Sequence, residues 1–262
     1  MIDELLCEVP ECHGIFDTHA HYDDSRFDGI RDTLLEQLHL KGVTNIINCG
    51  CDIKSSEKAL ELASKFDFMY AAVGFHPENL DPTPDLAHLK TLLQHEKAVA
   101  LGEIGLDYHW DIDKDLQHEW FEEQLKLSLE LDIPVIIHDR EAHDDCLKLL
   151  KKYKPKGVMH CFSGSVETAK EILKLGMYIG LGGVVTFKNA RKTVEVAEMI
   201  PLDRLLLETD CPYLAPVPFR GKTCHSGHIA FVAERIAEIR ATTTEEIVSV
   251  TNKNAKELFN IK

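Results

Sequence analysis

The chain of 262 residues has no apolar stretch long enough to cross a membrane, because a spanning helix needs roughly 18 or more apolar residues in succession. Residues 1–13 are acidic, and they lack the basic start and the apolar centre of a secretory signal peptide. We therefore expect a protein that has no membrane partner and that is, by default, cytoplasmic.

A disulfide framework is also missing. The eight cysteines, which include Cys7 and Cys12, are scattered along the chain, and no two have the Cys-x-x-Cys spacing. Cys49, Cys161 and Cys211 adjoin apolar runs that are typical of strands. Cysteines of this kind, in a chain without a secretory signal, favour reduced thiols over disulfides.

Positive charge is scarce. Lysine and arginine together number 29, against 44 aspartates and glutamates, so the net charge is −15. This net charge argues against a broad basic surface for nucleic acid. It still allows an enzyme that contacts phosphates through metal ions and a few local cations, with weak and salt-sensitive binding of long duplexes.

What is present is an eightfold alternation of short apolar runs and helical segments. We expect strands at residues 14–19, 45–49, 69–75, 98–102, 135–137, 157–159, 178–181 and 204–207. Helices are expected at 30–41, 55–66, 84–96, 115–131, 142–153, 166–175, 190–199, 227–239 and 244–259, with the last one broken near Thr251.

Eight strands that are apolar almost throughout, each followed by a helix, predict an α/β fold of the TIM-type (β/α)8 barrel class. We expect residues 1–262 to form this barrel as a single domain. The alternative is a doubly wound open sheet, which needs fewer strands and a Gly-rich phosphate-binding turn. Neither Gly-x-Gly-x-x-Gly nor the P-loop pattern occurs in the sequence.

Polar side chains follow the predicted strands. His19 and His21 end the first strand and share one face, because the side-chain period of a strand is two. The carboxyl ends of barrel strands converge on one active-site face. The later strand ends supply His76, Glu103, His138, His160, Glu208 and Asp210.

Imidazole and carboxylate groups gathered in one place indicate a metal site. The expected ligands are His19, His21, Glu103, His138, His160 and Asp210. This set exceeds what one tetrahedral ion uses, so we predict two divalent cations, Mg²⁺, Mn²⁺ or Zn²⁺, that share a bridging carboxylate. Glu103 is the expected bridge, because its strand lies across the barrel from the strand that carries His19 and His21.

The remaining histidines are interpreted as ordinary surface residues. His39, His88, His95 and His118 fall in helical segments. His109 and His143 follow the fourth and fifth strands, so lining the mouth of the site is their alternative. For His76, which precedes Pro77, a loop position and a contact with substrate remain equally open.

Six segments carry a resemblance to a known family: FDTHAH at 16–21, VGFHP at 73–77, GEIGLD at 102–107, PVIIHDR at 134–140, HCFSG at 160–164 and LETDCPYL at 207–214. Together they resemble the TatD family of metal-dependent deoxyribonucleases, within the amidohydrolase-like barrel superfamily. The resemblance spans nearly the whole chain. It implies hydrolysis of phosphodiester bonds in DNA, at single strands or 3′ ends and mainly by exonucleolytic trimming, with RNA as a further substrate.

The resemblance also implies how the ligands divide between the cations. One cation would lie among His19, His21, Glu103 and Asp210, and a second among Glu103, His138 and His160. Asp210 would orient the attacking water and take its proton, and Glu208 would position a metal-bound water or protonate the leaving group. Phosphate oxygens would be contacted by Arg140, Ser163, Arg220 and Lys222.

The chain departs from the family pattern after the eighth strand. The usual Arg-Gly-Lys-x-Asn-x-Pro is replaced by RGKTCHSGH at 220–228. We interpret this segment as a remodelled loop near the mouth. The alternative is an extra metal site formed by Cys224, His225 and His228.

Two other functions compete. The same barrel serves hydrolases of small amides, lactones or phosphoesters, but many of these bridge their metals with a modified lysine where Glu103 stands here. A non-enzymatic binding protein is disfavoured by the complete ligand set. The sequence does not determine the oligomeric state and is compatible with a monomer.

Overall fold

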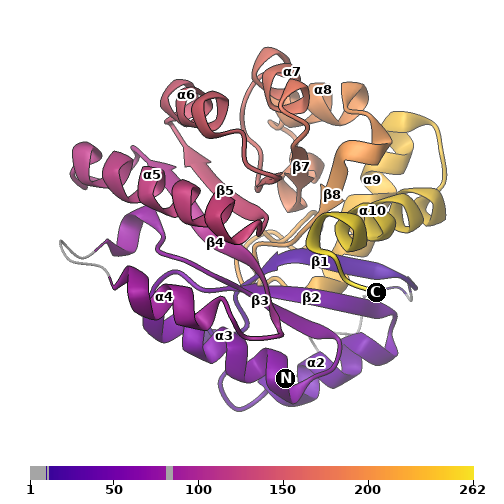
Figure 1. The fold of residues 1–262 in the computed structure, drawn as a ribbon. Helices are drawn as coiled ribbons and strands as arrows, with labels where there is room; N and C mark the ends of the chain where they lie inside the picture. The colour runs from indigo at the N-terminus through magenta and orange to yellow at the C-terminus, as the bar shows by residue number, and fades with distance from the viewer. Residues whose placement is uncertain (1–9, 11, 81–84) are drawn as a thin grey trace.

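The computed structural model describes residues 10, 12–80 and 85–262. In this part of the chain eight strands pair in parallel, in the order in which they occur in the sequence, and Figure 1 shows the helices around the outside of the sheet. The strands are β1 (Ile15–Ala20), β2 (Val43–Cys49), β3 (Met69–Val73), β4 (Ala98–Asp107), β5 (Val135–Arg140), β6 (Gly157–Met159), β7 (Tyr178–Leu181) and β8 (Leu205–Leu207). The helices are α2 (Arg31–Leu40), α3 (Ile53–Lys65), α4 (Leu86–Leu92), α5 (Lys114–Leu131), α6 (His143–Tyr153), α7 (Val166–Lys174), α8 (Arg191–Met199), α9 (Ile229–Arg240) and α10 (Thr244–Phe259).

The first strand pairs with the segment that follows the last strand, and this pairing closes the sheet. Ala20 and Cys211 form a parallel bridge, and the amide of His21 donates to the Cys211 carbonyl at 2.8 Å. The Thr18 hydroxyl donates to the Leu207 carbonyl at 3.0 Å. The predicted TIM-type (β/α)8 barrel is thereby confirmed, and the open-sheet alternative is excluded.

The interior of the barrel is filled by a cluster that takes a buried side chain from every strand. These side chains are Phe16, Ile47, Ala72, Ala100, Ile136, Val158, Tyr178 and Leu206. Ala255 and Phe259 of α10 join the same cluster. The Asn252 side chain also donates to the Gly14 carbonyl, just before β1, at 2.8 Å. Helix α10 therefore closes the amino end of the barrel and leaves the carboxyl ends of the strands as the open face.

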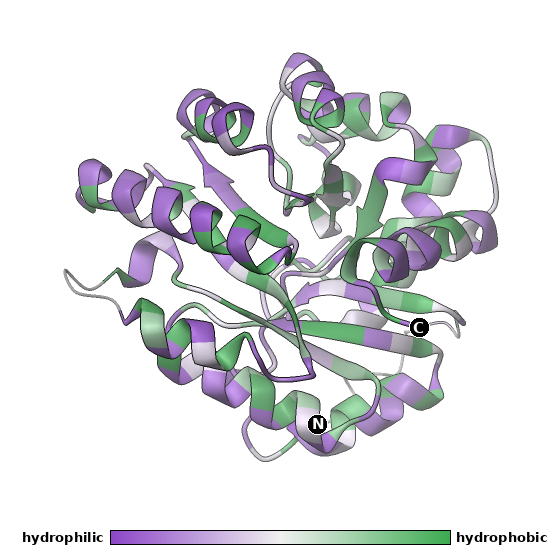
Figure 2. Cartoon of the chain, in the orientation of Figure 1, coloured by the Kyte–Doolittle hydropathy of each residue, from purple (hydrophilic) through white to green (hydrophobic). Residues whose placement is uncertain are grey.

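A second and larger apolar core lies between the strands and the helices that surround them. In Figure 2 the strands are mostly green, or hydrophobic, whereas the helices carry both green residues and purple, hydrophilic ones. None of the helices in the described part of the chain combines the length and the apolar character that crossing a membrane requires. The seven cysteines in that part are free thiols.

Strand β4 is longer than the predicted strand at 98–102. Glu103 and Asp107 interrupt its apolar run, but Ile104 and Leu106 alternate with them and are buried in the outer core. A period of two places the acidic and the apolar side chains on opposite faces. The strand therefore brings two carboxylates to the inner side of the barrel.

The last helix is also different from the prediction. Helix α10 is continuous, and the predicted break near Thr251 is wrong. Thr251 is buried, and its hydroxyl donates to the Ile247 carbonyl one turn earlier at 2.8 Å. A threonine satisfied in this way remains within a helix. The predicted start of the 84–96 helix, Cys7 and most of segment 1–13 lie outside the described residues.

Candidate metal centre

A cavity of about 780 Å³ opens at the carboxyl ends of the strands. The predicted site residues that line it are His21, His76, Glu103, His138, Arg140, Ser163, His160 and Asp210. His19 is fully buried beside them. The convergence expected of a barrel therefore holds for side chains that come from six strand ends.

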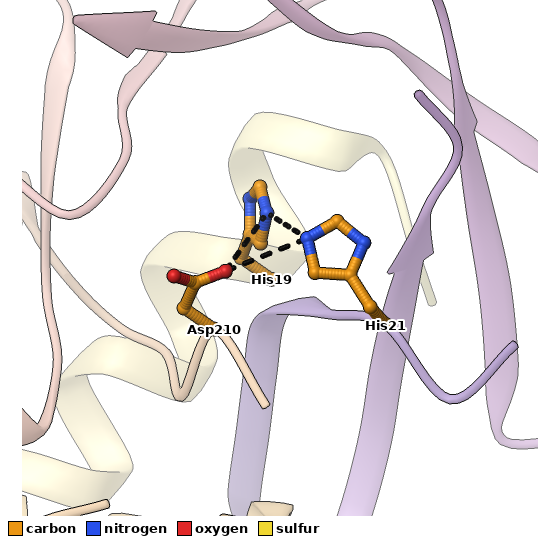
Figure 3. Close-up of side chains that lie close together, drawn as sticks. All are labelled: His19, His21 and Asp210. Carbon is orange, nitrogen blue, oxygen red and sulfur yellow. Dashed lines mark hydrogen bonds and ion pairs between the residues drawn. The ribbon is translucent and has the colours of Figure 1, made fainter. Parts of the chain in front are cut away.

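His19, His21 and Asp210 form one group of donor atoms (Figure 3). The Nε2 atoms of the two imidazoles lie 3.0 Å apart. Asp210 Oδ1 lies 3.4 Å from His21 Nε2 and 3.8 Å from His19 Nε2. The group joins the end of β1 to the segment that follows β8, because the Asp210 amide donates to the His19 carbonyl at 2.9 Å.

The buried carboxylate of Asp17 holds these two chain segments together. Its Oδ1 atom accepts from the Thr209 amide at 3.0 Å, and its Oδ2 atom accepts from the hydroxyls of Thr209 at 2.6 Å and Ser226 at 2.7 Å. Burial raises the pKa of Asp17 to about 7, although these hydrogen bonds oppose the shift. Asp17 therefore links the strand that carries His19 to the segment that carries Asp210, and so fixes the first donor group.

Glu103 lies between this group and a second group of imidazoles. Its Oε2 atom is 3.2 Å from His19 Nε2 and 3.6 Å from His21 Nε2. Its Oε1 atom is 2.7 Å from His160 Nε2 and 2.8 Å from His138 Nδ1. One oxygen thus faces each group, which is the arrangement expected of a bridging carboxylate.

His76 belongs to the second group as well. Its Nε2 atom lies 3.4 Å from Glu103 Oε1, and His76, Glu103 and His138 form one of the possible three-donor metal groups. The side chain is buried, and its Nδ1 atom accepts from the Glu78 amide at 3.1 Å. The structure therefore places His76 beside Glu103 and also within a hydrogen-bonded loop, and its contact with substrate stays a prediction.

The charges of the site are coupled. Burial alone would raise the pKa of Glu103, but His160, His76 and His19 hold it well below its usual value. Burial alone would lower the pKa of His160, and Glu103 together with Glu208 holds it well above its usual value. The site thus favours the anionic form of Glu103 and the protonated form of His160.

A divalent cation fits this donor set. His138 Nδ1 lies 3.4 Å from His160 Nε2, and the corresponding distance between His19 and His21 is 3.0 Å. Two ring nitrogens at such distances cannot both carry a proton pointing at the other, whereas both can direct a lone pair at one cation. Imidazole nitrogen and carboxylate oxygen are ligands that Zn²⁺, Mn²⁺ and Fe²⁺ accept.

Two carboxylates lie behind imidazoles that face Glu103. His138 Nε2 lies 2.9 Å from Asp107 Oδ2, and His160 Nδ1 lies 3.6 Å from Glu208 Oε1. A carboxylate behind a ligating histidine fixes its ring orientation and raises its basicity. The approach of β4 to His138 also requires a glycine, since a Cβ atom on Gly105 would lie 1.9 Å from the His138 carbonyl oxygen.

Glu208 does not occupy the position predicted for it. Its side chain is buried, does not line the cavity, and accepts from the Cys161 amide while facing His160. Gly180 packs so closely against it that a Cβ atom there would meet Glu208 Oε2 at 2.4 Å. Glu208 therefore faces His160 and not the cavity, and its predicted role, to position a metal-bound water or to protonate a leaving group, stays a prediction.

Arg220 and Lys222 are also placed away from the cavity. The Arg220 guanidinium lies over the Phe187 ring, 4.0 Å from its centroid, and Lys222 Nζ lies 5.4 Å from the Phe219 centroid. Neither residue lines the cavity. Both were expected to contact phosphate, and the loop that carries them turns their side chains toward aromatic rings instead.

The loop at 220–228 shows no metal group among the described residues. The rings of His225 and His228 stack with their centroids 3.9 Å apart, and the Phe219 ring also stacks with His228, at a centroid distance of 4.6 Å. Cys224, His225 and His228 belong to none of the donor groups in the described part of the chain. The structure thus agrees with a remodelled loop rather than an extra metal site.

The other histidines fall where the sequence suggested. His39, His88, His95 and His118 are exposed or half-buried, on helices or directly beside them. His109 and His143 do not line the cavity. Their partners are Glu141 at 3.2 Å and Asp139 at 2.7 Å.

Sequence reasoning missed several residues of the site, and four of them enter the arguments below. Asp107 lies behind His138, and the cavity is also lined by Cys51, Trp110 and Tyr213. The signal for Cys51 was available, because it follows the second strand just as His21 follows the first. Trp110 and Tyr213 carried no comparable signal, because they lie in irregular segments whose direction the sequence does not specify.

Comparison with known proteins agrees with the resemblance. A family model described as TatD related DNase matches residues 16–260. The metal-dependent hydrolase YabD of Bacillus subtilis is 47% identical over 253 residues, which cover 94% of this chain and 99% of YabD. The protein of Cronobacter sakazakii named 3′-5′ ssDNA/RNA exonuclease TatD is 33% identical over 261 residues, which cover 94% of this chain and 97% of that protein.

One solved structure is similar to this chain in both fold and sequence. The crystal structure of YjjV, a TatD homologue from Escherichia coli K12, superposes with a TM-score of 0.88 at 35% identity, covering 95% of this chain and 98% of YjjV. A TatD family hydrolase from Entamoeba histolytica superposes with a TM-score of 0.86 at 24% identity, covering 96% of this chain and 99% of the hydrolase, and supports the fold alone.

Proposed function

The chain belongs to the family of TatD-related DNases, whose members are metal-dependent hydrolases, and on this premise we propose that it trims DNA, and also RNA, from the end of a single strand. The observation that carries the proposal is Glu103 at the edge of the cavity, because one of its carboxylate oxygens faces His19 and the other faces His160. Two cations that share a carboxylate suit the hydrolysis of phosphodiesters.

We propose the following ligands. His19, His21, Glu103 and Asp210 would hold one cation, and Glu103, His138 and His160 would hold a second, with His76 beside it. When bound, Mg²⁺, Mn²⁺ or Zn²⁺ would lower the pKa of water and polarise a phosphoryl oxygen.

Asp210 is the residue proposed to accept the proton of the attacking water. Burial alone would raise its pKa, but His21 and His19 hold it below its usual value, so that the carboxylate is anionic. Its side chain is 20% exposed, whereas that of Glu103 is 4% exposed. Asp210 is therefore the carboxylate of the centre that reaches furthest toward the cavity.

Arg140 and Ser163 are the proposed donors to the phosphate. Both line the cavity, and both come from segments that also carry proposed ligands, His138 and His160. Among the described residues that line this cavity, Arg140 is the one lysine or arginine. We therefore expect a single guanidinium contact with phosphate rather than a basic groove.

Two exposed aromatic side chains support a single-stranded substrate. Trp110 and Tyr213 line the cavity and are 48% and 49% exposed. Each has an arginine nearby, since Arg140 Cζ lies 5.8 Å from the Trp110 centroid and Arg26 Cζ lies 4.1 Å from the Tyr213 centroid. Unpaired bases stack on such rings, whereas the bases of a duplex already stack on one another.

One observation favours a second candidate function. The cavity is also lined by carboxylates outside the two donor groups, namely Asp23, Asp24, Asp52, Glu78 and Asp139. Acidic walls repel a polyanion and tolerate a neutral substrate. Hydrolysis of a small amide, lactone or phosphoester on the same centre is therefore the alternative.

A substrate panel separates the two functions. The protein loaded with Mg²⁺, Mn²⁺ or Zn²⁺ is incubated with 3′-labelled single-stranded DNA, duplex DNA, RNA and small esters and amides. We expect release of mononucleotides from single strands, faster than from duplexes. If an amide or lactone were hydrolysed while the oligonucleotides stayed intact, the nuclease proposal would be wrong and its alternative would be supported.

A further inference from the structure

Cys51 lies at the metal centre, although neither the ligand pattern of the sequence nor the proposed mechanism uses it. It follows β2 and lines the cavity. Its Sγ atom, a ring nitrogen of His21 and a carboxylate oxygen of Glu103 all lie within 4.8 Å of one another. Three donor atoms at this separation could hold one metal ion together.

The backbone of Cys51 is held in place on both sides. Its amide donates to the Ser55 hydroxyl at 2.8 Å, and its carbonyl accepts from the His76 amide at 2.9 Å. Ser55 also accepts from the Asp52 amide at 3.0 Å in the capping box that starts α3. The thiol is therefore presented by a fixed turn, as the other donors are presented by strand ends.

A second cysteine provides an internal comparison. Cys161 also lines the cavity, just after β6. Its Sγ atom belongs to none of the three-donor groups in the described part of the chain. Two thiols thus face the same cavity, and one of them meets an imidazole and a carboxylate.

We propose that Cys51 is a sulfur ligand on the His21 side of the centre, and that it makes this site prefer a thiophilic divalent cation such as Zn²⁺ over Mg²⁺. Thiolate is a soft ligand that suits Zn²⁺ and Cd²⁺, whereas Mg²⁺ prefers oxygen and retains its water. On binding, the sulfur lone pair goes to the cation and the thiol proton goes to the buffer, without oxidation or reduction.

The inference rests on the metal-binding part of the proposed function and is independent of the substrate. Its test uses Cd²⁺ alone as the probe, with metal-free full-length protein and no nucleic acid. The readout is the ultraviolet charge-transfer band of a Cd²⁺–thiolate bond, recorded together with bound Cd²⁺. The variants are Cys51→Ser and the matched Cys161→Ser, with Cys51→Ala as a second substitution if the first does not fold.

We expect the band in the wild type and in Cys161→Ser, and its loss in Cys51→Ser. In a chelator competition, Cys51→Ser should lose at least roughly tenfold in Zn²⁺ affinity, as for groups that support a metal site, and should keep its Mg²⁺ affinity. A band that persists in Cys51→Ser, or bound Cd²⁺ without a band in the wild type, overturns the inference. The same results leave the nuclease proposal intact, because that proposal is tested by nucleotide release.

Discussion

His138 Nε2 lies 2.9 Å from Asp107 Oδ2, while the other ring nitrogen of His138 faces Glu103 Oε1 at 2.8 Å. The imidazole is thus held between a carboxylate at its back and the proposed bridging carboxylate in front. Asp107 is buried and also accepts from the His109 amide at 2.8 Å. Asp107 belongs to none of the three-donor groups among the described residues, and its position is the one from which a carboxylate orients a ligating imidazole.

The first prediction concerns this pair. Asp107→Ala should weaken metal binding at the His138 side by roughly 10–100-fold, because loss of such a supporting partner frees the ring and lowers its basicity. The affinity is measured by chelator competition with Zn²⁺ and Mn²⁺. Asp111→Ala, at an exposed position shortly after β4, is the control. Equal metal affinities in the two variants would show that Asp107 does not support metal binding.

The second prediction tests Asp210 as the proton acceptor. Asp210→Asn should lower the rate of single-strand hydrolysis by roughly 10²–10⁴-fold at saturating metal, which is the range for a general base. The melting temperature and the bound metal are measured in parallel, so that loss of the fold or of the cation is recognised. Glu78→Gln, which removes an exposed carboxylate from the cavity wall, is the control. A metal-loaded Asp210→Asn with the wild-type rate would refute the assignment.

The third prediction separates base contacts from chemistry. Trp110→Ala and Tyr213→Ala should each raise KM for a single-stranded oligonucleotide, because stacking of a base on an aromatic ring contributes about 1–3 kcal/mol, or roughly 5–150-fold. The hydrolysis of bis(p-nitrophenyl) phosphate, which has no base, should be unchanged. Leu129→Ala, on α5 and 47% exposed, is the control for loss of an exposed apolar side chain. If hydrolysis of both substrates fell equally, the two rings would contribute to the fold and not to the binding of bases.

The fourth prediction concerns stability at acidic pH. Burial lowers the pKa of His228 to about 2, with a further contribution from His225. The unfolded chain binds a proton at this residue below its ordinary pKa of about 6.5 and the folded chain does not, so the free energy of unfolding falls as the pH drops below that value. At pH 5 the loss from this residue is about 2 kcal/mol.

His228→Gln should therefore lose less stability than the wild type between pH 7.5 and pH 5. Urea denaturation at the two pH values gives the difference, and His88→Gln, on α4, is the control. If wild type and His228→Gln lose the same stability over this interval, His228 is not the residue responsible. Because the comparison uses the change with pH, any constant cost of the substitution cancels.

Much of the candidate site could be predicted because the ligands stand at strand ends. The residues at or just after the carboxyl ends of the predicted strands were identified from the polar residue that ends each apolar run, and the barrel brings them together, although Glu103 and His138 lie inside β4 and β5. The bridging position of Glu103 was also predicted, from its place across the ring from His19. The structure places its two oxygens toward the two groups as that reasoning required.

The direction of side chains in irregular segments could not be predicted. Arg220 and Lys222 were expected at the mouth, yet their cationic groups lie over Phe187 and Phe219. Glu208 has the same spacing from Asp210 as His19 has from His21, yet it points behind His160. Beyond the strand ends, a spacing of two does not specify the face, because φ and ψ no longer follow the strand.

The sequence by itself determined the barrel and the chemical type of its centre, since hydrophobic periodicity specifies the strands, and parallel strands in a closed sheet deliver their ends to one face. The tertiary structure alone decided which groups meet there. It turned Asp107 and Glu208 toward the backs of imidazoles and brought Cys51 to His21. These contacts join segments that are distant in the sequence, so they depend on packing and backbone direction and not on local spacing.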